Sequence, residues 1–149
     1  MKIRLLWVGK TRTRFISEGI EHYIKLLRPM VNLNIVELKE ARGMAKVAVL
    51  DAEAKAILRA SKDYILLDER GLEPTSVGFA ELLQGYLQSS KTIDFVFGGA
   101  FGVSSEVKKN AMATLSLSKM TLPHELSRLV FLEQLYRAFT ILKGKEYHY

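Results

Sequence analysis

The chain has 149 residues, of which 48% are apolar and 26% are charged, and 22 Lys and Arg against 16 Asp and Glu leave a net charge of +6. This balance excludes a disordered or fibrous protein, and the length predicts a single domain over residues 1–149. The absence of cysteine excludes disulfides, thiolate metal sites and a cysteine nucleophile. No apolar run reaches the roughly 20 residues of a membrane span, so we expect a cytoplasmic protein without a membrane partner.

The hydrophobic pattern predicts strands and helices in alternation. We expect strands over residues 3–8, 31–35, 64–67, 93–97 and 114–117, with a polar turn over 68–71 ending the third. Helices are expected over 14–27 and 47–60, from a cap at Thr75 or Ser76, from a cap at Ser104 or Ser105, and from Pro123 to about Leu142. Five alternations with short connections predict an α/β fold, a mostly parallel sheet flanked by helices.

Basic residues are concentrated at the beginning of the chain. Five precede the first carboxylate at Glu18, namely Lys2, Arg4, Lys10, Arg12 and Arg14. The excess positive charge favours polyanionic partners, and the loop over residues 10–14 is a candidate phosphate-binding surface. A solvated surface of no further function explains such a run equally well.

The last helix is apolar around most of its circumference, whereas a helix on a sheet needs only one apolar stripe. We infer that a second copy of the chain covers the surplus in a two-fold homodimer. The alternative is that neighbouring helices or the C-terminal tail bury it.

Two loops that follow predicted strands can bring backbone groups to a ligand. Residues 97–102 hold three glycines in five positions between a strand and a helix, but they lack the dinucleotide and phosphate-loop spacings. A tight structural turn explains them equally well. Residues 117–124 interleave hydroxyl and apolar side chains, and their backbone can read an adenine edge or merely connect to the last helix.

Little in the sequence indicates acid–base or metal chemistry. No Ser/His/Asp order, carboxylate pair or metal-ligand cluster stands out, and His124 is interpreted as a helix-start residue. The tail places three ring side chains at Tyr147, His148 and Tyr149, which suit stacking on a base or docking into a neighbouring cleft.

Taken together, several segments closely resemble the ribosomal RNA large subunit methyltransferase H family, collinearly over essentially the whole chain. They are Val-Gly-Lys at 8–10, Leu-Asp-Glu-Arg-Gly at 67–71, Phe-Gly-Gly-Ala-Phe-Gly at 97–102, Leu-Ser-Leu-Ser-Lys-Met-Thr-Leu-Pro-His at 115–124, Glu-Gln-Leu-Tyr-Arg-Ala-Phe at 133–139 and Tyr-His at 147–148.

The resemblance implies a SPOUT methyltransferase with a C-terminal trefoil knot, a rare exception to ordinary chain connectivity. It implies a homodimer that binds S-adenosyl-L-methionine in the knot, needs no metal, and methylates N3 of a pseudouridine in 23S rRNA of the assembled 70S ribosome. By motif match, the cofactor contacts fall on Leu67, Gly98, Leu117, Ser118, Lys119, Met120, Thr121 and Leu122.

From the resemblance we also expect His148 and Tyr147 to orient or deprotonate the target base, reaching the cofactor of the partner subunit. Lys10, Arg12 and Arg14 are expected on rRNA phosphates. One departure is that the chain ends in Tyr149, where similar chains carry a basic residue. The competing functions are a non-catalytic RNA- or ribosome-binding module and, with less support, a nucleotide- or flavin-binding protein.

Overall fold

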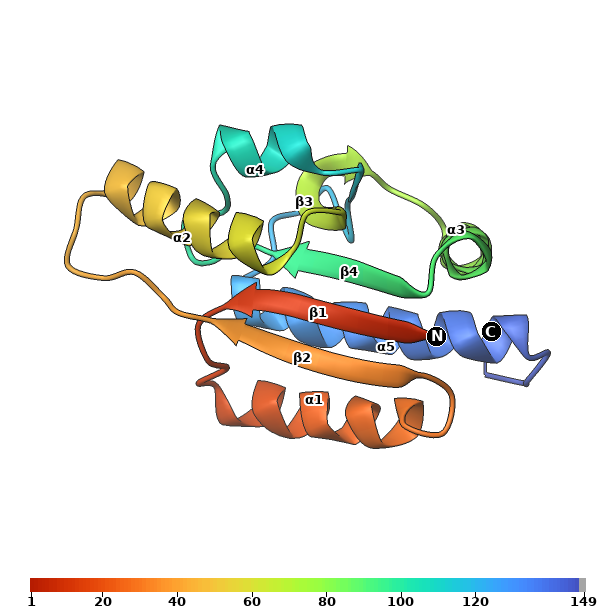
Figure 1. The fold of residues 1–149 in the computed structure, drawn as a ribbon. Helices are drawn as coiled ribbons and strands as arrows, with labels where there is room; N and C mark the ends of the chain where they lie inside the picture. Colours follow the sequence, from red (N-terminus) through yellow and green to blue (C-terminus); the bar gives the residue numbers. More distant parts are fainter. Residues whose placement is uncertain (148–149) are drawn as a thin grey trace.

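The computed structural model describes residues 1–147, in which strands and helices alternate along the chain (Figure 1). The strands are β1 (Lys2–Val8), β2 (Asn32–Leu38), β3 (Tyr64–Leu72), β4 (Thr92–Phe97) and β5 (Ala113–Leu115). The helices are α1 (Arg14–Leu27), α2 (Lys46–Ala60), α3 (Ser76–Ser89), α4 (Ser105–Asn110) and α5 (His124–Leu142). Of the alternative caps, Thr75 precedes α3 and its side chain accepts a hydrogen bond from Gly78 N. Ser104 precedes α4 and its side chain accepts from Val107 N.

The strands form one sheet in the order β2-β1-β4-β3-β5, and every neighbouring pair is parallel. The predicted α/β fold is therefore confirmed. Because all strands run in the same direction, their carboxyl ends lie at the same edge of the sheet, and crossover connections return the chain to the opposite edge. In open sheets of this kind, that edge is where ligands bind.

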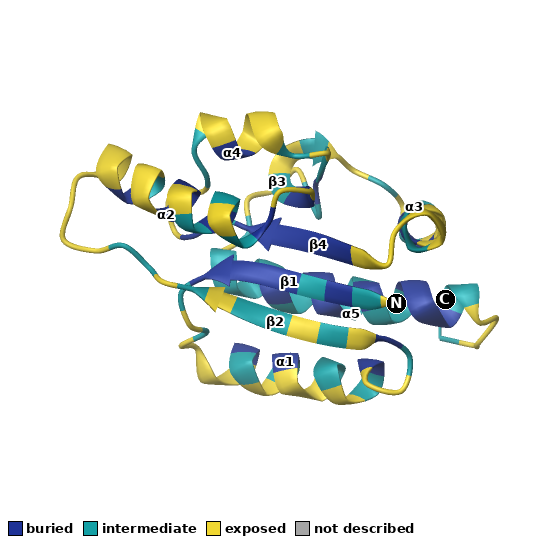
Figure 2. Ribbon diagram, viewed as in Figure 1, coloured by how far each residue is buried: buried dark blue, intermediate teal, exposed yellow. Residues whose placement is uncertain are grey.

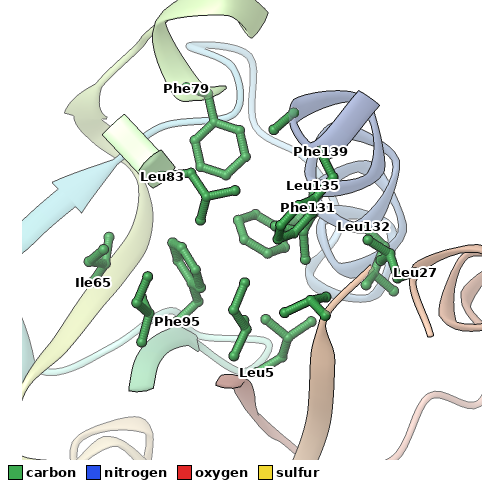
Figure 3. Close-up of a cluster of buried hydrophobic side chains, with 14 of the residues drawn as sticks. Leu5, Leu27, Ile65, Phe79, Leu83, Phe95, Phe131, Leu132, Leu135 and Phe139 are labelled. Carbon is green, nitrogen blue, oxygen red and sulfur yellow. The ribbon is translucent and has the colours of Figure 1, made fainter. Parts of the chain in front are cut away.

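Helices cover both faces of the sheet, because successive strand side chains point to opposite sides. The larger core lies between the sheet and α1, α3 and α5, and Figure 3 shows Phe131 beside Phe95 in it. The ring centroid of Phe131 lies 4.8 Å from that of Phe95 in a tilted contact and 5.2 Å from that of Phe97 in an edge-to-face contact. The smaller core, which includes Leu66 and Val96, lies under α2 and α4. Figure 2 shows β1 and β4 buried at the centre of the molecule.

Helix α5 lies in the larger core and packs against both α1 and α3. Its buried apolar residues are Phe131, Leu132, Leu135, Ala138 and Phe139. Its other apolar residues are partly covered, and none of them is fully exposed. Neighbouring helices thus bury much of the surplus from which we inferred a dimer, and the homodimer stays a prediction.

Strand β3 continues to Leu72, past the turn that was expected to end it. Its pairing with β5 shifts register between Leu67 and Leu72, so the residues between them leave the ladder and return. Gly71 permits the return, because a Cβ there would lie 2.6 Å from the backbone carbonyl of Thr114. Ser116 N then donates to Leu72 O at 2.8 Å.

Within residues 1–147, no helix is both long enough and apolar enough to span a membrane. The trefoil knot stays a prediction.

Candidate functional site

A cavity of about 640 Å³ opens at the carboxyl ends of β3, β4 and β5. Three segments supply most of its lining: the end of β3 from Leu67 to Arg70, the glycine-rich loop over residues 97–103, and the loop over 117–124. Lys108 of α4 and Ser127 of α5 complete it. A volume of this size suits a ligand of cofactor dimensions.

The glycine-rich loop doubles back on itself at the cavity. Gly99 and Gly102 form an antiparallel bridge in which Gly102 N donates to Gly99 O at 3.0 Å. Gly102 has a φ of +78°, which side chains rarely permit. A Cβ at Gly98 would lie 2.7 Å from the carbonyl oxygen of Gly102. The loop is therefore a tight structural turn that also forms a wall of the cavity, and its role in ligand binding stays a prediction.

The loop over residues 117–123 is held by its hydroxyl groups. Ser116 Oγ donates to Ser118 O at 2.9 Å, and Ser118 Oγ accepts from Met120 N at 2.9 Å. Thr121 Oγ1 donates to Glu69 Oε2 at 2.6 Å, which ties this loop to the end of β3.

Free backbone donors remain in this loop. Among the described residues, nothing accepts a hydrogen bond from the N–H of Leu117 or of Leu122, and both residues line the cavity. A polar ligand can accept hydrogen bonds from these N–H groups, and a loop that recognises an adenine edge needs such free backbone groups.

The cavity lining includes nearly all the residues expected to contact the cofactor. They are Leu67, Gly98, Leu117, Ser118, Met120, Thr121 and Leu122. Lys119 is exposed and is not part of the lining.

Charged groups are present on the cavity wall. Asp68 lies 3.8 Å from Lys108 Nζ, and Glu69 is held by Thr121. Within residues 1–147, no group of three or more His, Asp or Glu side chains is placed to hold a metal ion.

His124 is the first residue of α5 and also lines the cavity. Burial, with the nearby positive charge of Arg128, lowers the pKa of His124 below its usual value. The imidazole is therefore neutral at pH 7 and can accept a proton. The interpretation of His124 as a helix-start residue is confirmed. No sequence pattern indicated that it lines the same cavity as the glycine-rich loop.

The basic loop over residues 10–13 is attached to the first turn of α5. Glu125 Oε1 accepts hydrogen bonds from the backbone N–H groups of Arg12 and Thr13, each at 2.9 Å. The side chains of Lys10, Arg12 and Arg14 are exposed. Because α5 begins directly after the loop over 117–123, the basic loop lies next to the cavity.

Arg128, one helical turn further along α5, makes a second attachment from a fully buried position. It donates to Val8 O at 2.7 Å and to Thr11 Oγ1 at 2.9 Å, and its guanidinium lies 4.9 Å from the centre of the Trp7 ring. Burial lowers the pKa of Arg128 to about 10, so it stays charged at neutral pH. Neither Glu125 nor Arg128 was singled out from the sequence.

The structure does not bring Tyr147 to the cavity of its own chain. Its ring packs 4.8 Å from Tyr136 and 4.9 Å from the guanidinium of Arg137, against the second half of α5. Burial and the neighbouring Tyr23 raise the pKa of Tyr147 to about 12, so the phenol keeps its proton at neutral pH. His148 lies outside the described residues.

Two solved structures with a similar fold carry titles that name probable methyl-transferring proteins. A "probable methylase family protein" from Haemophilus influenzae superposes with a TM-score of 0.58 at 15% identity, over 99% of this chain and 70% of that one. A "probable methyltransferase" from Bordetella pertussis superposes with a TM-score of 0.56 at 12% identity, over 92% of this chain and 95% of that one. At these identities the likeness concerns the fold alone.

The sequence comparisons are more specific. A protein from Thermodesulfovibrio yellowstonii, named ribosomal RNA large subunit methyltransferase H, is 46% identical over 99% of both chains. A protein of the same name from an Anaeromyxobacter species is 44% identical, again over 99% of both chains. The family model described as "Predicted SPOUT methyltransferase" matches residues 1–148. This chain therefore belongs to the SPOUT methyltransferases and, among them, to the ribosomal RNA large subunit methyltransferase H family.

Proposed function

We propose that this protein transfers a methyl group from S-adenosyl-L-methionine to N3 of a pseudouridine in 23S rRNA, and that its substrate is the assembled 70S ribosome. The observation that carries the proposal is the cavity in which the glycine-rich loop meets the loop over residues 117–123. The full-length relatives named as rRNA methyltransferases support the substrate class.

The residues of the cavity fit this cofactor. The free N–H groups of Leu117 and Leu122 can hydrogen-bond an adenine edge, and glycine at position 98 lets the cavity wall fold tightly, because a Cβ there would lie 2.7 Å from the carbonyl oxygen of Gly102. The carboxylates of Asp68 and Glu69 favour a cationic ligand on the same wall. When bound, the cofactor supplies an electrophilic methyl group on a sulfonium, so the protein has chiefly to align the acceptor nitrogen.

The acceptor N3 carries an imide proton that must leave before or during transfer. We assign its orientation or removal to His148 and Tyr147 of the partner subunit, because Tyr147 does not line the cavity of its own chain. Where it packs against α5 of its own chain, Tyr147 has a pKa of about 12 and keeps its proton, so we assign it the role of a hydrogen-bond donor rather than of a base. The neutral imidazole of His124, which also lines the cavity, is a second group that can accept this proton.

The same proposal assigns Lys10, Arg12 and Arg14 to rRNA phosphates. It treats residues 1–149 as one domain, and it places the protein in the cytoplasm, where ribosomes are. The homodimer completes the site, since the tail then reaches the second cavity.

Transfer of labelled methyl to three substrates tests the proposal: intact ribosomes, separated large subunits and naked rRNA. We expect label in intact ribosomes alone, found as N3-methylpseudouridine after digestion. Cofactor binding without label in any of the three would point to another acceptor. The absence of both cofactor binding and label would favour a non-catalytic ribosome-binding module.

A further inference from the structure

Phe101 lies in the turn between Gly99 and Gly102 of the glycine-rich loop and lines the cavity. About half of its side chain, 52%, is exposed to solvent. The Nζ atom of Lys46, the first residue of α2, lies 5.8 Å from the centre of the ring. Isolated exposed apolar side chains are common, but an open aromatic ring beside a cation at a ligand cavity has the composition of a base-stacking site.

The loop that carries Phe101 is braced from behind. The buried carboxylate of Glu53 in α2 lies against Gly99, where a Cβ would be 3.0 Å from Glu53 Oε1. The other carboxylate oxygen of Glu53 accepts from Ala41 N at 3.3 Å. The loop therefore rests on α2 and on the segment over residues 39–45, which limits the conformations open to Phe101 and lowers the entropy lost on binding.

The surroundings of the ring suit a nucleic acid. Figure 1 shows that the connections after β1, β2 and β4 leave the sheet at the same edge. The exposed cations in these connections and at the start of α2 include Lys10, Arg12, Lys39, Arg42 and Lys46. Arg12 and Arg42 share the carboxylate of Glu40, at 3.1 and 2.8 Å, which joins the basic loop to the segment that precedes α2. Phosphates bound along these cations would bring an unstacked base to the ring.

We propose that Phe101, with Lys46 beside it, is a stacking platform for a nucleobase of rRNA at the entrance to the methyl-transfer cavity. The inference rests on the proposed function, and it assigns the ring to the RNA substrate rather than to the cofactor. Alanine substitutions at stacking platforms weaken binding by about 10-fold to 100-fold per base.

The test compares Phe101→Leu, which keeps an apolar side chain without a ring, with Phe101→Trp, which keeps a stacking surface. The control is Met112→Ala, because Met112 is similarly exposed (54%) but does not line the cavity. We expect Phe101→Leu to raise the KM for ribosomes about 10-fold or more and to leave the Kd for S-adenosyl-L-methionine unchanged. Phe101→Trp and Met112→Ala should behave like the parent protein.

Phe101→Trp gives a second measurement that does not depend on turnover. The parent has only Trp7, which is 1% exposed, so a tryptophan at position 101 would be the only solvent-accessible indole. Its fluorescence should be quenched by an RNA hairpin that contains pseudouridine, whereas that of the parent should not. If RNA quenches Phe101→Trp but the parent transfers no methyl group, the stacking platform is supported and the proposed function is refuted.

Three results would overturn the platform while the parent remains an active rRNA methyltransferase. In the first, Phe101→Leu has the KM of the parent. In the second, its Kd for the cofactor rises by the same factor as its KM, which would make Phe101 a cofactor contact. In the third, sedimentation shows that Phe101→Leu dissociates a dimer, which would make Phe101 a subunit contact.

Discussion

Glu125 should be a positioning residue for rRNA binding, although its side chain need not touch RNA. One of its carboxylate oxygens accepts the N–H groups of Arg12 and Thr13, each at 2.9 Å, close to the solvent. Hydrogen bonds of this kind are worth roughly 0.5–1.5 kcal/mol each. Glu125→Ala should therefore release the basic loop at a cost of about 1–2 kcal/mol for the pair.

A loop that is held only part of the time lowers the apparent affinity in proportion to its binding-competent fraction. We expect the KM of Glu125→Ala for ribosomes to rise about 5-fold to 30-fold, with the Kd for S-adenosyl-L-methionine changed by less than about twofold. The salt dependence separates positioning from direct contact. Glu125→Ala keeps every cation, so the slope of log affinity against log salt should not change, whereas Arg12→Gln should lower it by about one unit.

The matched control is Glu18→Ala, which also removes a carboxylate near the basic loop. Glu18 pairs with Arg14 at 2.9 Å and holds no backbone group, so its loss should not raise the KM. Glu125→Gln, which retains an acceptor oxygen, should lie between the parent and Glu125→Ala. The reasoning fails if Glu125→Ala binds ribosomes like the parent, or if its salt slope falls as in Arg12→Gln.

Three further predictions follow from the site and its supports. Gly98→Ala should weaken S-adenosyl-L-methionine binding in calorimetry by about 10-fold or more, because its Cβ would lie 2.7 Å from the Gly102 carbonyl oxygen. Gly85→Ala, which meets no atom within 4 Å in α3, should instead raise the unfolding free energy by about 0.5–1 kcal/mol, and equal cofactor binding by both variants would refute the argument. Burial lowers the pKa of His124, so the unfolded state binds more protons and the free energy of unfolding falls as the pH drops through 6.5. His124→Asn should flatten this dependence in denaturant titrations between pH 7 and about 5. An unchanged profile would contradict the prediction. Burial raises the pKa of Glu53, with Glu40 adding to the shift, so the free energy of unfolding falls as the pH rises above 4.5. Glu53→Gln should remove this pH dependence and be at least as stable as the parent at pH 7. A less stable variant would contradict the prediction.

Periodicity alone predicted most of the fold, because the apolar pattern of each helix and strand follows the face or faces that it buries. The predicted helix over residues 14–27 matches α1, and alternating side chains place Leu5 and Leu6 in different cores. The end of β3 was predicted wrongly, since polar residues 68–71 look like a turn. Only the close approach of Gly71 to β5 shows that the strand resumes at Leu72.

The candidate site was predictable to a different extent on each wall of the cavity. The loops over residues 97–102 and 117–122 are continuous motifs, and all of their residues except Lys119 line the cavity. The attachments of the basic loop join residues more than 110 positions apart, which no local pattern indicates. Glu125 and Arg128 look like ordinary helix residues in the sequence, and only the packing of α5 against the end of β1 gives them a role.

The most direct test of the central claim is to locate the methyl group that the protein adds to rRNA. After reaction of unmodified 70S ribosomes with S-adenosyl-L-methionine, reverse transcription of the 23S rRNA shows where the Watson–Crick edge of a base is blocked. Methylation at N3 of pseudouridine predicts one new stop, together with N3-methylpseudouridine in the digested nucleosides, and Gly98→Ala should reduce both when the cofactor is limiting. Label in the rRNA without a stop, carried by a 2′-hydroxyl or by a different base, would contradict the account.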